Sequence, residues 1–293
     1  MTPCRSPLIS ARELAGAMAG DVADRPVLLD TSFDLSDLSA GEREYLAAHV
    51  PGALYLHLER DLSGAKQSTD GRFRGRHPLP DIDDFAALMG RSGIGIDSRV
   101  VVYDRQGGMM AARAWWLLRW LGHADVAVLD GAMPAWLAAG GTVESGPNPH
   151  LSRFDGQAPY PHHGPALPTV DADELQSKLQ QMPLIDARAP ERYRGEVEPL
   201  DAAAGHIPGA SNRFFKDNLQ ADGRFKSAGQ LAADFKPLIG ERPVQDVIHQ
   251  CGSGVTACHN MLAMEIAGLP GSRLYPGSWS EWSSNPERPI ARG

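Results

Sequence analysis

The stretch VIHQCGSGVTAC, residues 247–258, contains the order of elements that decides the fold. An apolar run typical of a strand ends at Cys251, a Gly-Ser-Gly turn follows, and a helical pattern begins near Thr256. Short apolar runs that alternate with helical patterns are typical of parallel strands joined by crossover helices. Further strand-like runs lie at 27–29, 100–103, 126–129, 184–185 and 273–275, and helical patterns lie at 111–121 and 256–267. The sequence therefore predicts an α/β fold with mostly parallel sheets flanked by helices.

The chain also repeats itself, with a long spacing between the matching segments. The paired segments occur in the same order: VLLD (27–30) with PLID (183–186), HVPGA (49–53) with HIPGA (206–210), and DGRF (70–73) with DGRF (222–225). This spacing is too long for a solenoid repeat and indicates a domain duplicated in tandem. Helix-start signals support this: Ser10 with Glu13, Asp171 with Glu174, and Ser227 with Gln230. We expect a first domain at 7–143, a proline-rich linker at 144–168 and a second domain at 169–293.

Composition narrows the function classes. The 293 residues include 36 acidic and 28 basic side chains, a formal net charge of −8, without runs of Lys or Arg. Phosphate binding requires a basic surface, so we expect neither a nucleic acid nor a membrane as partner. The sequence also lacks a stretch of ~20 apolar residues and the pattern of a signal peptide. With only three cysteines, which fits a reducing compartment, we expect a cytoplasmic protein.

Cys251 is the strongest candidate for chemistry. In open parallel sheets, ligands bind beyond the carboxyl ends of the strands. Gly252 and Gly254 allow the backbone to curl so that successive N–H groups converge, and the following helix adds its positive N-terminal end. Thiols in such settings ionise readily, so we predict a thiolate nucleophile. The alternative, a small buried apolar side chain, leaves the Gly-Ser-Gly loop unexplained, whereas core filling is the better explanation for Cys258.

The first copy has a different residue at the matching position. There the run Val100 to Tyr103 ends in Asp104, which cannot serve as a thiolate. We therefore expect a single working centre, in the second copy, and an inactive first copy.

These features resemble the two-domain rhodanese and 3-mercaptopyruvate sulfurtransferase family. The resemblance rests on the two HxPGA segments, the CGSGVTA loop (251–257) and GSWSEW (277–282), and it extends from about residue 8 to 290. It implies two tandem rhodanese-like domains that move a sulfane sulfur from a small donor, through a persulfide on Cys251, to an acceptor. The donor would be 3-mercaptopyruvate or thiosulfate, and the acceptor a thiol, a thioredoxin-like protein or cyanide. Neither a metal nor a cofactor is implied.

Two other classes stay open at this level. One is a persulfide carrier that does not turn over a small donor. The other is a cysteine phosphatase or arsenate reductase, which needs an arginine where Ala257 stands here.

The resemblance also implies site residues. Five residues after the cysteine form the catalytic loop: Gly252, Ser253, Gly254, Val255 and Thr256. Ser253 and Thr256 bear hydroxyls that suit a sulfur or a substrate carbonyl, although each is also suited to cap a helix. The neutral loop favours a mercaptopyruvate-like donor. Its carboxylate would bind Arg192, because a guanidinium meets a carboxylate through two parallel hydrogen bonds; the alternative is an exposed loop charge.

The chain departs from the family pattern at one position. A second carboxylate-binding arginine is expected after Glu198-Pro199, where Leu200 stands; Arg194 or a basic residue of the stretch 72–77 is the candidate replacement. From the first copy, Glu59 matches an acidic residue and His77 a histidine of the family's site. Arg188 is expected to tie its loop in place. We place Trp279 and Trp282 in a loop after the last strand, either over the pocket or in the core.

Overall fold

The computed structural model describes residues 6–148 and 156–293 and divides into two compact units. Unit 1 comprises Met1–Leu62, Pro80–Ala166 and Ala221–Arg224; unit 2 comprises Ser63–Leu79, Leu167–Gln220 and Phe225–Gly293. A segment of the first half of the chain, Ser63–Leu79, thus belongs to unit 2. The predicted linker lies partly outside the described residues, and the expected boundaries at 143 and 169 remain a prediction.

Unit 1 contains a five-stranded parallel sheet in the order β1-β5-β4-β2-β3. Its strands are β1 (Leu8–Ile9), β2 (Val27–Asp30), β3 (Leu54–Tyr55), β4 (Val100–Tyr103) and β5 (Val126–Leu129). Its helices are α1 (Ala11–Ala19), α2 (Ala40–Ala47), α3 (Ile82–Arg91), α4 (Ala111–Trp120) and α5 (Ala132–Ala138), with a 3₁₀ turn at Val22–Asp24. One face of the sheet shares a core with α1, α2 and α5, and α4 packs on β4 and β5. Covered faces of this kind explain why the strands are apolar throughout.

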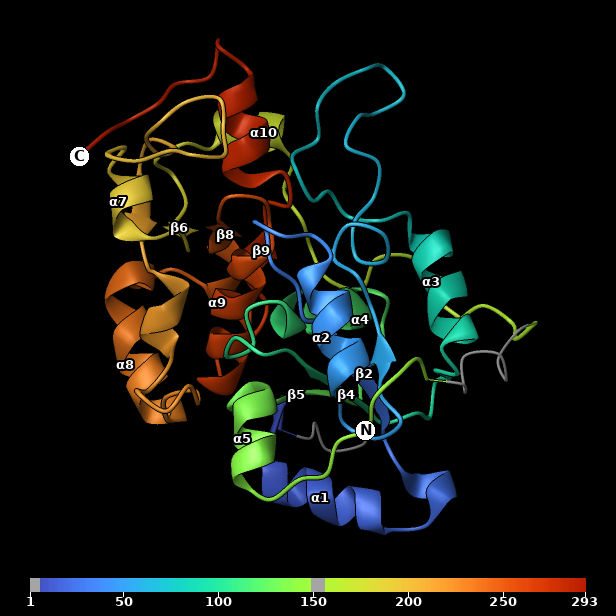
Figure 1. Cartoon of the computed structure of the whole chain (residues 1–293). Coiled ribbons are helices and arrows are strands. Elements are labelled where there is room, and N and C mark those ends of the chain that lie inside the picture. Colours follow the sequence, from blue (N-terminus) through green and yellow to red (C-terminus); the bar gives the residue numbers. More distant parts are fainter. Residues whose placement is uncertain (1–5, 149–155) are drawn as a thin grey trace. The chain divides into compact units, whose positions relative to one another are not determined.

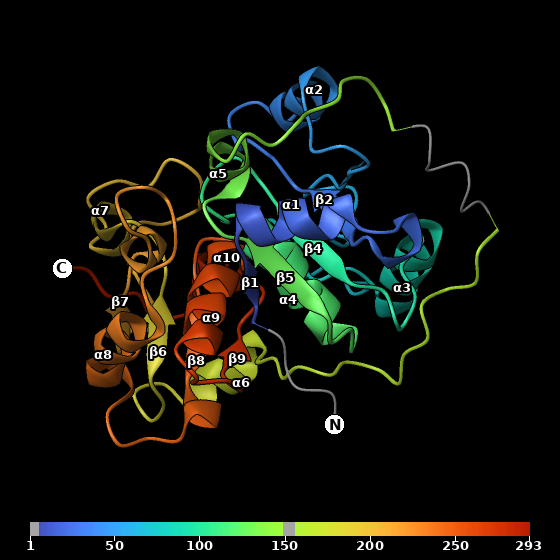
Figure 2. The same ribbon diagram turned by 90° about the horizontal axis from the view of Figure 1, so that it is seen from below.

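Unit 2 repeats this plan with a four-stranded parallel sheet in the order β7-β6-β8-β9. Its strands are β6 (Leu184–Asp186), β7 (Ala210–Asn212), β8 (Ile248–Gln250) and β9 (Arg273–Leu274). Its helices are α6 (Ala172–Ser177), α7 (Pro190–Tyr193), α8 (Ala228–Ile239), α9 (Thr256–Ile266) and α10 (Ser278–Ser284), with 3₁₀ turns at Phe215–Asn218 and Val244–Asp246. Helices α8 and α9 lie side by side, as Figure 1 and Figure 2 show. The sheet also shares a core with Leu175, Tyr193, Trp279 and Trp282.

The repeated HxPGA segments perform the same structural task in both units. His49 stacks on Tyr45 with ring centroids 4.0 Å apart, and His206 stacks on Tyr193 at 3.9 Å. In each pair, the histidine Nδ1 also lies within 2.8 Å of the tyrosine carbonyl oxygen. Matching geometry at matching positions is what a duplicated domain predicts.

Most predicted elements are present, and one prediction is wrong. The capping boxes at Ser10 and Ser227 are complete, and Asp171 accepts the N–H of Glu174 at 2.8 Å. The loop predicted around Trp279 and Trp282 is instead the short helix α10, which buries both indole rings completely in the core of unit 2. Within the described residues, no helix is long and apolar enough to cross a membrane.

Candidate active site

Cys251 lies directly after β8 and is 2% exposed. Its N–H donates to Oγ of Ser278 at 3.2 Å, and its carbonyl accepts the N–H of Trp279 at 3.0 Å. The hydroxyl of Ser278 donates in turn to the carbonyl of Tyr275 at 2.9 Å. The backbone of the cysteine is therefore held by the first turn of α10, a contact that the sequence did not reveal.

The loop after Cys251 depends on its glycines. Gly254 has a φ of +78°, and a Cβ at this position would lie 2.4 Å from the carbonyl oxygen of Pro276. A side chain is therefore excluded both by conformation and by space. In the part of the chain that the structure describes, the N–H groups of Gly252, Ser253 and Val255 donate to no protein acceptor. The loop thus presents unused donors next to the N-terminus of α9.

His77 joins this loop, although it lies far away in the sequence. Its Nδ1 is 2.8 Å from Oγ of Ser253, and the ring is buried. The approach depends on Gly75, whose φ is +96° and whose missing Cβ would be 2.7 Å from the carbonyl oxygen of Gly277. The N–H of Arg76 then donates to Oγ of Ser280 at 3.1 Å. Segment Ser63–Leu79 therefore brings both Arg76 and His77 to the cysteine loop of unit 2.

Two guanidinium groups converge on Gly252. A Cβ at Gly252 would lie 2.9 Å from Nη2 of Arg76 and 3.4 Å from Nη1 of Arg192. The Asp201 carboxylate bridges the two arginines: Arg76 pairs with its Oδ1, and Nη2 of Arg192 lies 2.9 Å from its Oδ2. Burial, which outweighs the attraction of Arg76, raises the pKa of Asp201 above its usual range.

Glu198 organises the loop that supplies Asp201. Its Oε1 accepts from Nη2 of Arg192 at 2.7 Å and from the N–H groups of Leu200 and Asp201. The other oxygen of Glu198 lies 3.5 Å from Nη1 of Arg188. Nη2 of the same arginine binds Oδ2 of Asp186 at 2.7 Å. Arg188 is thus buried and structural in its contacts, as expected.

The other residues considered in the sequence analysis take different positions. Thr256 is the first residue of α9 and is half-buried. Cys258 is fully buried, and its Sγ donates to the carbonyl of Gly254 at 3.3 Å, which ties the helix to the loop. Glu59 belongs to unit 1, where its N–H donates to Nδ1 of His57 at 3.1 Å, and its role stays a prediction. Arg194 pairs with Glu196 at 2.7 Å and is half-exposed.

Sequence reasoning missed three contributors to the site. Arg76 was only one of several basic candidates, and neither Ser278 nor Asp201 was assigned a role. The available signals were weak: a glycine before Arg76, and an acidic residue directly after Leu200.

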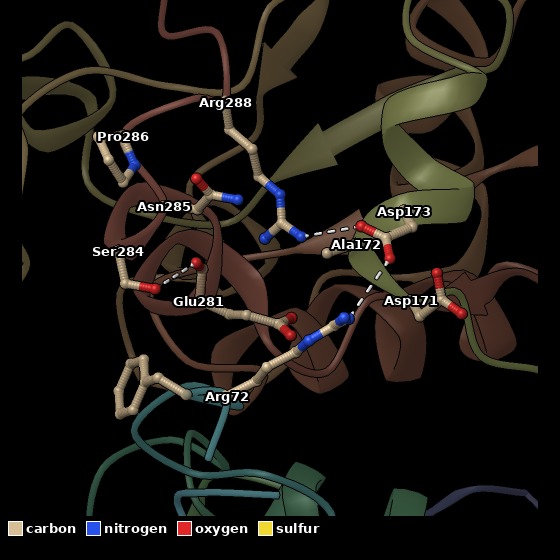
Figure 3. Close-up of a pocket in the computed structure, with 10 residues that line it drawn as sticks. Arg72, Asp171, Ala172, Asp173, Glu281, Ser284, Asn285, Pro286 and Arg288 are labelled. Carbon is tan, nitrogen blue, oxygen red and sulfur yellow. Dashed lines mark hydrogen bonds and ion pairs between the residues drawn. The ribbon is translucent and has the colours of Figure 1, made fainter. Parts of the chain in front are cut away.

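Unit 2 also has a separate cavity of about 510 Å³ between the start of α6 and the end of α10 (Figure 3). Arg288 and Arg72 both point toward Asp173, at 3.1 and 4.0 Å. Burial raises the pKa of Glu281, which lines the same cavity. Cys251 is not part of this lining.

The matching loop of the first copy shows what an anion can do at this place in the fold. The Asp104 carboxylate is fully buried and accepts four backbone N–H groups. The donors are Gln106 at 2.8 Å, Gly108 at 2.9 Å, Met110 at 2.7 Å and Ala111 at 3.0 Å. Converging amides at the start of a helix form an anion site. In unit 1, the chain's own side chain fills that site.

Comparisons with known proteins agree with this geometry. The family model described as a rhodanese-like domain matches twice, at residues 10–139 and 171–285. A probable 3-mercaptopyruvate sulfurtransferase of Pseudomonas aeruginosa is 46% identical over 290 residues, covering 98% of each chain. A putative thiosulfate sulfurtransferase, SseB, of Mycobacterium tuberculosis is 43% identical, covering 98% of this chain and 97% of that protein.

A solved structure is similar as well. The 3-mercaptopyruvate sulfurtransferase from Leishmania major superposes with a TM-score of 0.79 at 29% identity, covering 94% of this chain and 74% of that one. The duplicated parallel sheets, the cysteine loop and these matches lead to one conclusion: the chain belongs to the two-domain rhodanese and 3-mercaptopyruvate sulfurtransferase family.

Proposed function

We propose that this chain transfers a sulfane sulfur from 3-mercaptopyruvate, through a persulfide on Cys251, to a thiol or cyanide. The main observation in support is the difference between the loop after β4 and the loop after β8. The amides around Asp104 hold a carboxylate, whereas the N–H groups of Gly252, Ser253 and Val255 have no described acceptor. The second loop is therefore suited to stabilise a sulfur anion, first as thiolate and then as persulfide.

The first step forms one S–S bond and breaks one C–S bond. The Cys251 thiolate attacks the sulfur of the donor, and the electron pair of the C–S bond leaves with the carbon as the enolate of pyruvate. The thiol proton of the donor ends on that carbon, which gives pyruvate and a persulfide anion. In this proposal, the hydroxyl of Ser253 donates to the carbonyl oxygen while that oxygen gains negative charge. The 2.8 Å contact between Oγ of Ser253 and Nδ1 of His77 supports this role.

The second step returns the enzyme to its starting state. An acceptor thiolate, which a thioredoxin-like protein would also supply, or cyanide attacks the outer sulfur and releases the Cys251 thiolate. Gly254 and Val255 contribute backbone to the loop, and Thr256 opens the helix behind it. Arg192 would bind the donor carboxylate, and Glu59 would add an acidic group to the site. A cytoplasmic location is part of the proposal, supported by the low cysteine content.

Thiosulfate is the second candidate donor. It is favoured by the M. tuberculosis relative, which is named a putative thiosulfate sulfurtransferase, and by Leu200 in place of the second family arginine.

The test is a steady-state assay with each donor and cyanide as the acceptor. 3-Mercaptopyruvate should release pyruvate, thiosulfate should release sulfite, and both should yield thiocyanate. The peptide with Cys251 should gain the mass of one sulfur atom after incubation with donor alone. Cys251→Ser is the control for both readouts. Mass gain without product release would support a non-turnover carrier, and neither signal with either donor would refute the proposal.

A further inference from the structure

The two arginines beside Gly252 retain unused donors. Nη2 of Arg76 and Nη1 of Arg192 are the guanidinium atoms nearest to the missing Cβ, and neither donates to a described residue. Nε of each arginine is buried without a partner within the same described ranges. The paired sides of both groups face Asp201, and the unpaired sides face Gly252.

This position suits the anionic end of a sulfur donor. Gly252 follows Cys251 directly, and consecutive Cα atoms are about 3.8 Å apart. A donor whose sulfur meets Cys251 therefore reaches Gly252 with a group two or three bonds away. Mercaptopyruvate has its carboxylate at that separation, and thiosulfate has its oxygens there.

The other basic candidates are engaged elsewhere. Arg194 pairs with the exposed Glu196, and Arg72 pairs with Asp70 and points toward Asp173 in the separate cavity (Figure 3). Arg76 is placed at Gly252 by the turn at Gly75 and by its hydrogen bond to Ser280. It therefore supplies the second guanidinium that Leu200 cannot.

The charge of this group is balanced before any donor arrives. Arg76, Arg188 and Arg192 carry three positive charges. Asp186, Glu198 and Asp201 carry three negative charges. A site without surplus positive charge favours one added negative charge over two. The carboxylates offset the attraction of the guanidinium groups, whereas the cost of removing the ligand from water rises with its charge.

We propose that Arg76 and Asp201 select the donor by its charge, an inference that rests on the proposed function. Arg76 joins Arg192 in binding the anionic end, and the Asp201 carboxylate between them disfavours a dianion such as thiosulfate relative to a monoanion such as mercaptopyruvate. Donor preference is thereby set by a residue that need not touch the donor.

The test measures kcat/KM for both donors with one acceptor. Asp201→Asn should raise the ratio of thiosulfate to mercaptopyruvate activity about tenfold, since one negative charge is removed. Glu196→Gln, which removes an exposed carboxylate from the same segment, should leave the ratio unchanged. An unchanged ratio in folded Asp201→Asn would overturn the charge selection.

Arg76 gives an independent test that does not depend on Asp201→Asn folding. Arg76→Gln should raise KM for mercaptopyruvate about tenfold while kcat changes less, because a binding contact is lost. Arg194→Gln is the matched control and should behave like the wild type. An unchanged KM in Arg76→Gln would overturn the assignment of Arg76. If the wild type transferred sulfur from neither donor, the proposed function itself would fail, which separates the two conclusions.

Discussion

The loops after β4 and β8 begin at matching positions and use their amides in opposite ways. In unit 1, six residues separate Asp104 from α4, and the carboxylate accepts four N–H groups. In unit 2, only four residues separate Cys251 from α9, and three loop N–H groups have no acceptor among the described residues. The loop of unit 1 uses its donors for its own stability, and the loop of unit 2 leaves three N–H groups available for the ligand that we propose.

The hydrogen bonds that hold the two loops to the neighbouring helices also differ. The carbonyls of Asp104 and Cys251 accept N–H groups from Met133 and Trp279, which lie in the first turns of α5 and α10. The residue before each of these donors has a positive φ, 57° at Ala132 and 54° at Ser278. Only the serine offers an oxygen, which binds the N–H of Cys251. The two units thus share this backbone conformation, and unit 2 adds the hydroxyl of Ser278 to it.

The largest expected effect comes from the cysteine itself. Cys251→Ser should lower sulfur transfer by at least about 10³-fold, because the nucleophile is removed. Product release and the sulfur mass gain both report it. Cys258→Ser is the matched control and should retain most activity, since that thiol contacts the Gly254 carbonyl within the packed core. Equal losses in the two variants would contradict the role given to the loop.

The next effect concerns stability in unit 1. Asp104→Asn replaces a charged acceptor of four N–H groups by a neutral amide whose NH₂ end cannot accept. We expect the free energy of unfolding to fall by about 3 kcal/mol, since hydrogen bonds to charged groups are worth roughly 1.5–3 kcal/mol each. Urea unfolding measures the loss. Sulfur transfer at low temperature should persist, and a loss of activity in the still-folded variant would mean that Asp104 has a direct role.

A third prediction compares His249 with Val102, which occupy matching positions in β8 and β4. Burial lowers the pKa of His249 from 6.5 to about 3. Above pH 6.5 the histidine is neutral in both states, but below it the unfolded state binds a proton that the folded state does not. Stability is therefore lost as the pH falls from 6.5 toward 3, by about 2 kcal/mol near pH 5. His249→Val should flatten this part of the pH–stability curve; parallel curves for the two proteins would contradict the prediction.

The smallest effect is expected from Ser278→Ala, which places the residue of unit 1 into unit 2. The N–H of Cys251 loses its acceptor, a cost of about 1–2 kcal/mol. We expect kcat to fall roughly fivefold with little change in KM, because Ser278 positions the cysteine and does not meet the donor. Ser278→Gly, which accepts the positive φ of this position but also lacks the hydroxyl, should lower kcat by a similar factor. A change confined to KM would show that the residue acts on donor binding instead.

The fold could be predicted because its signals are local, and the prediction of Cys251 as the nucleophile rests on an equally local pattern. Alternation of apolar runs with helical patterns identified the parallel sheets, and glycines beside Cys251 identified the curled loop. The repeated HxPGA segments indicated a duplicated domain, and the His and Tyr rings that stack in both units agree with it. The short helix α10 was missed because two tryptophans in so short a segment are equally compatible with a loop that covers a pocket.

The sequence by itself determined the class of fold and the duplication, because periodicity and repetition can be recognised from the residues alone, and the glycines next to Cys251 predict that this residue is the nucleophile. Only the tertiary structure decided which distant side chains lie at the loop after Cys251. His77 reaches Ser253 across 176 residues, and Arg76, not Arg72 or Arg194, reaches Gly252. The sequence alone does not distinguish Arg76 from the other arginines. Arg76 is distinguished by the close backbone approach at Gly75 and by its ion pair with the buried Asp201. Both features arise from packing between segments that are distant in the sequence.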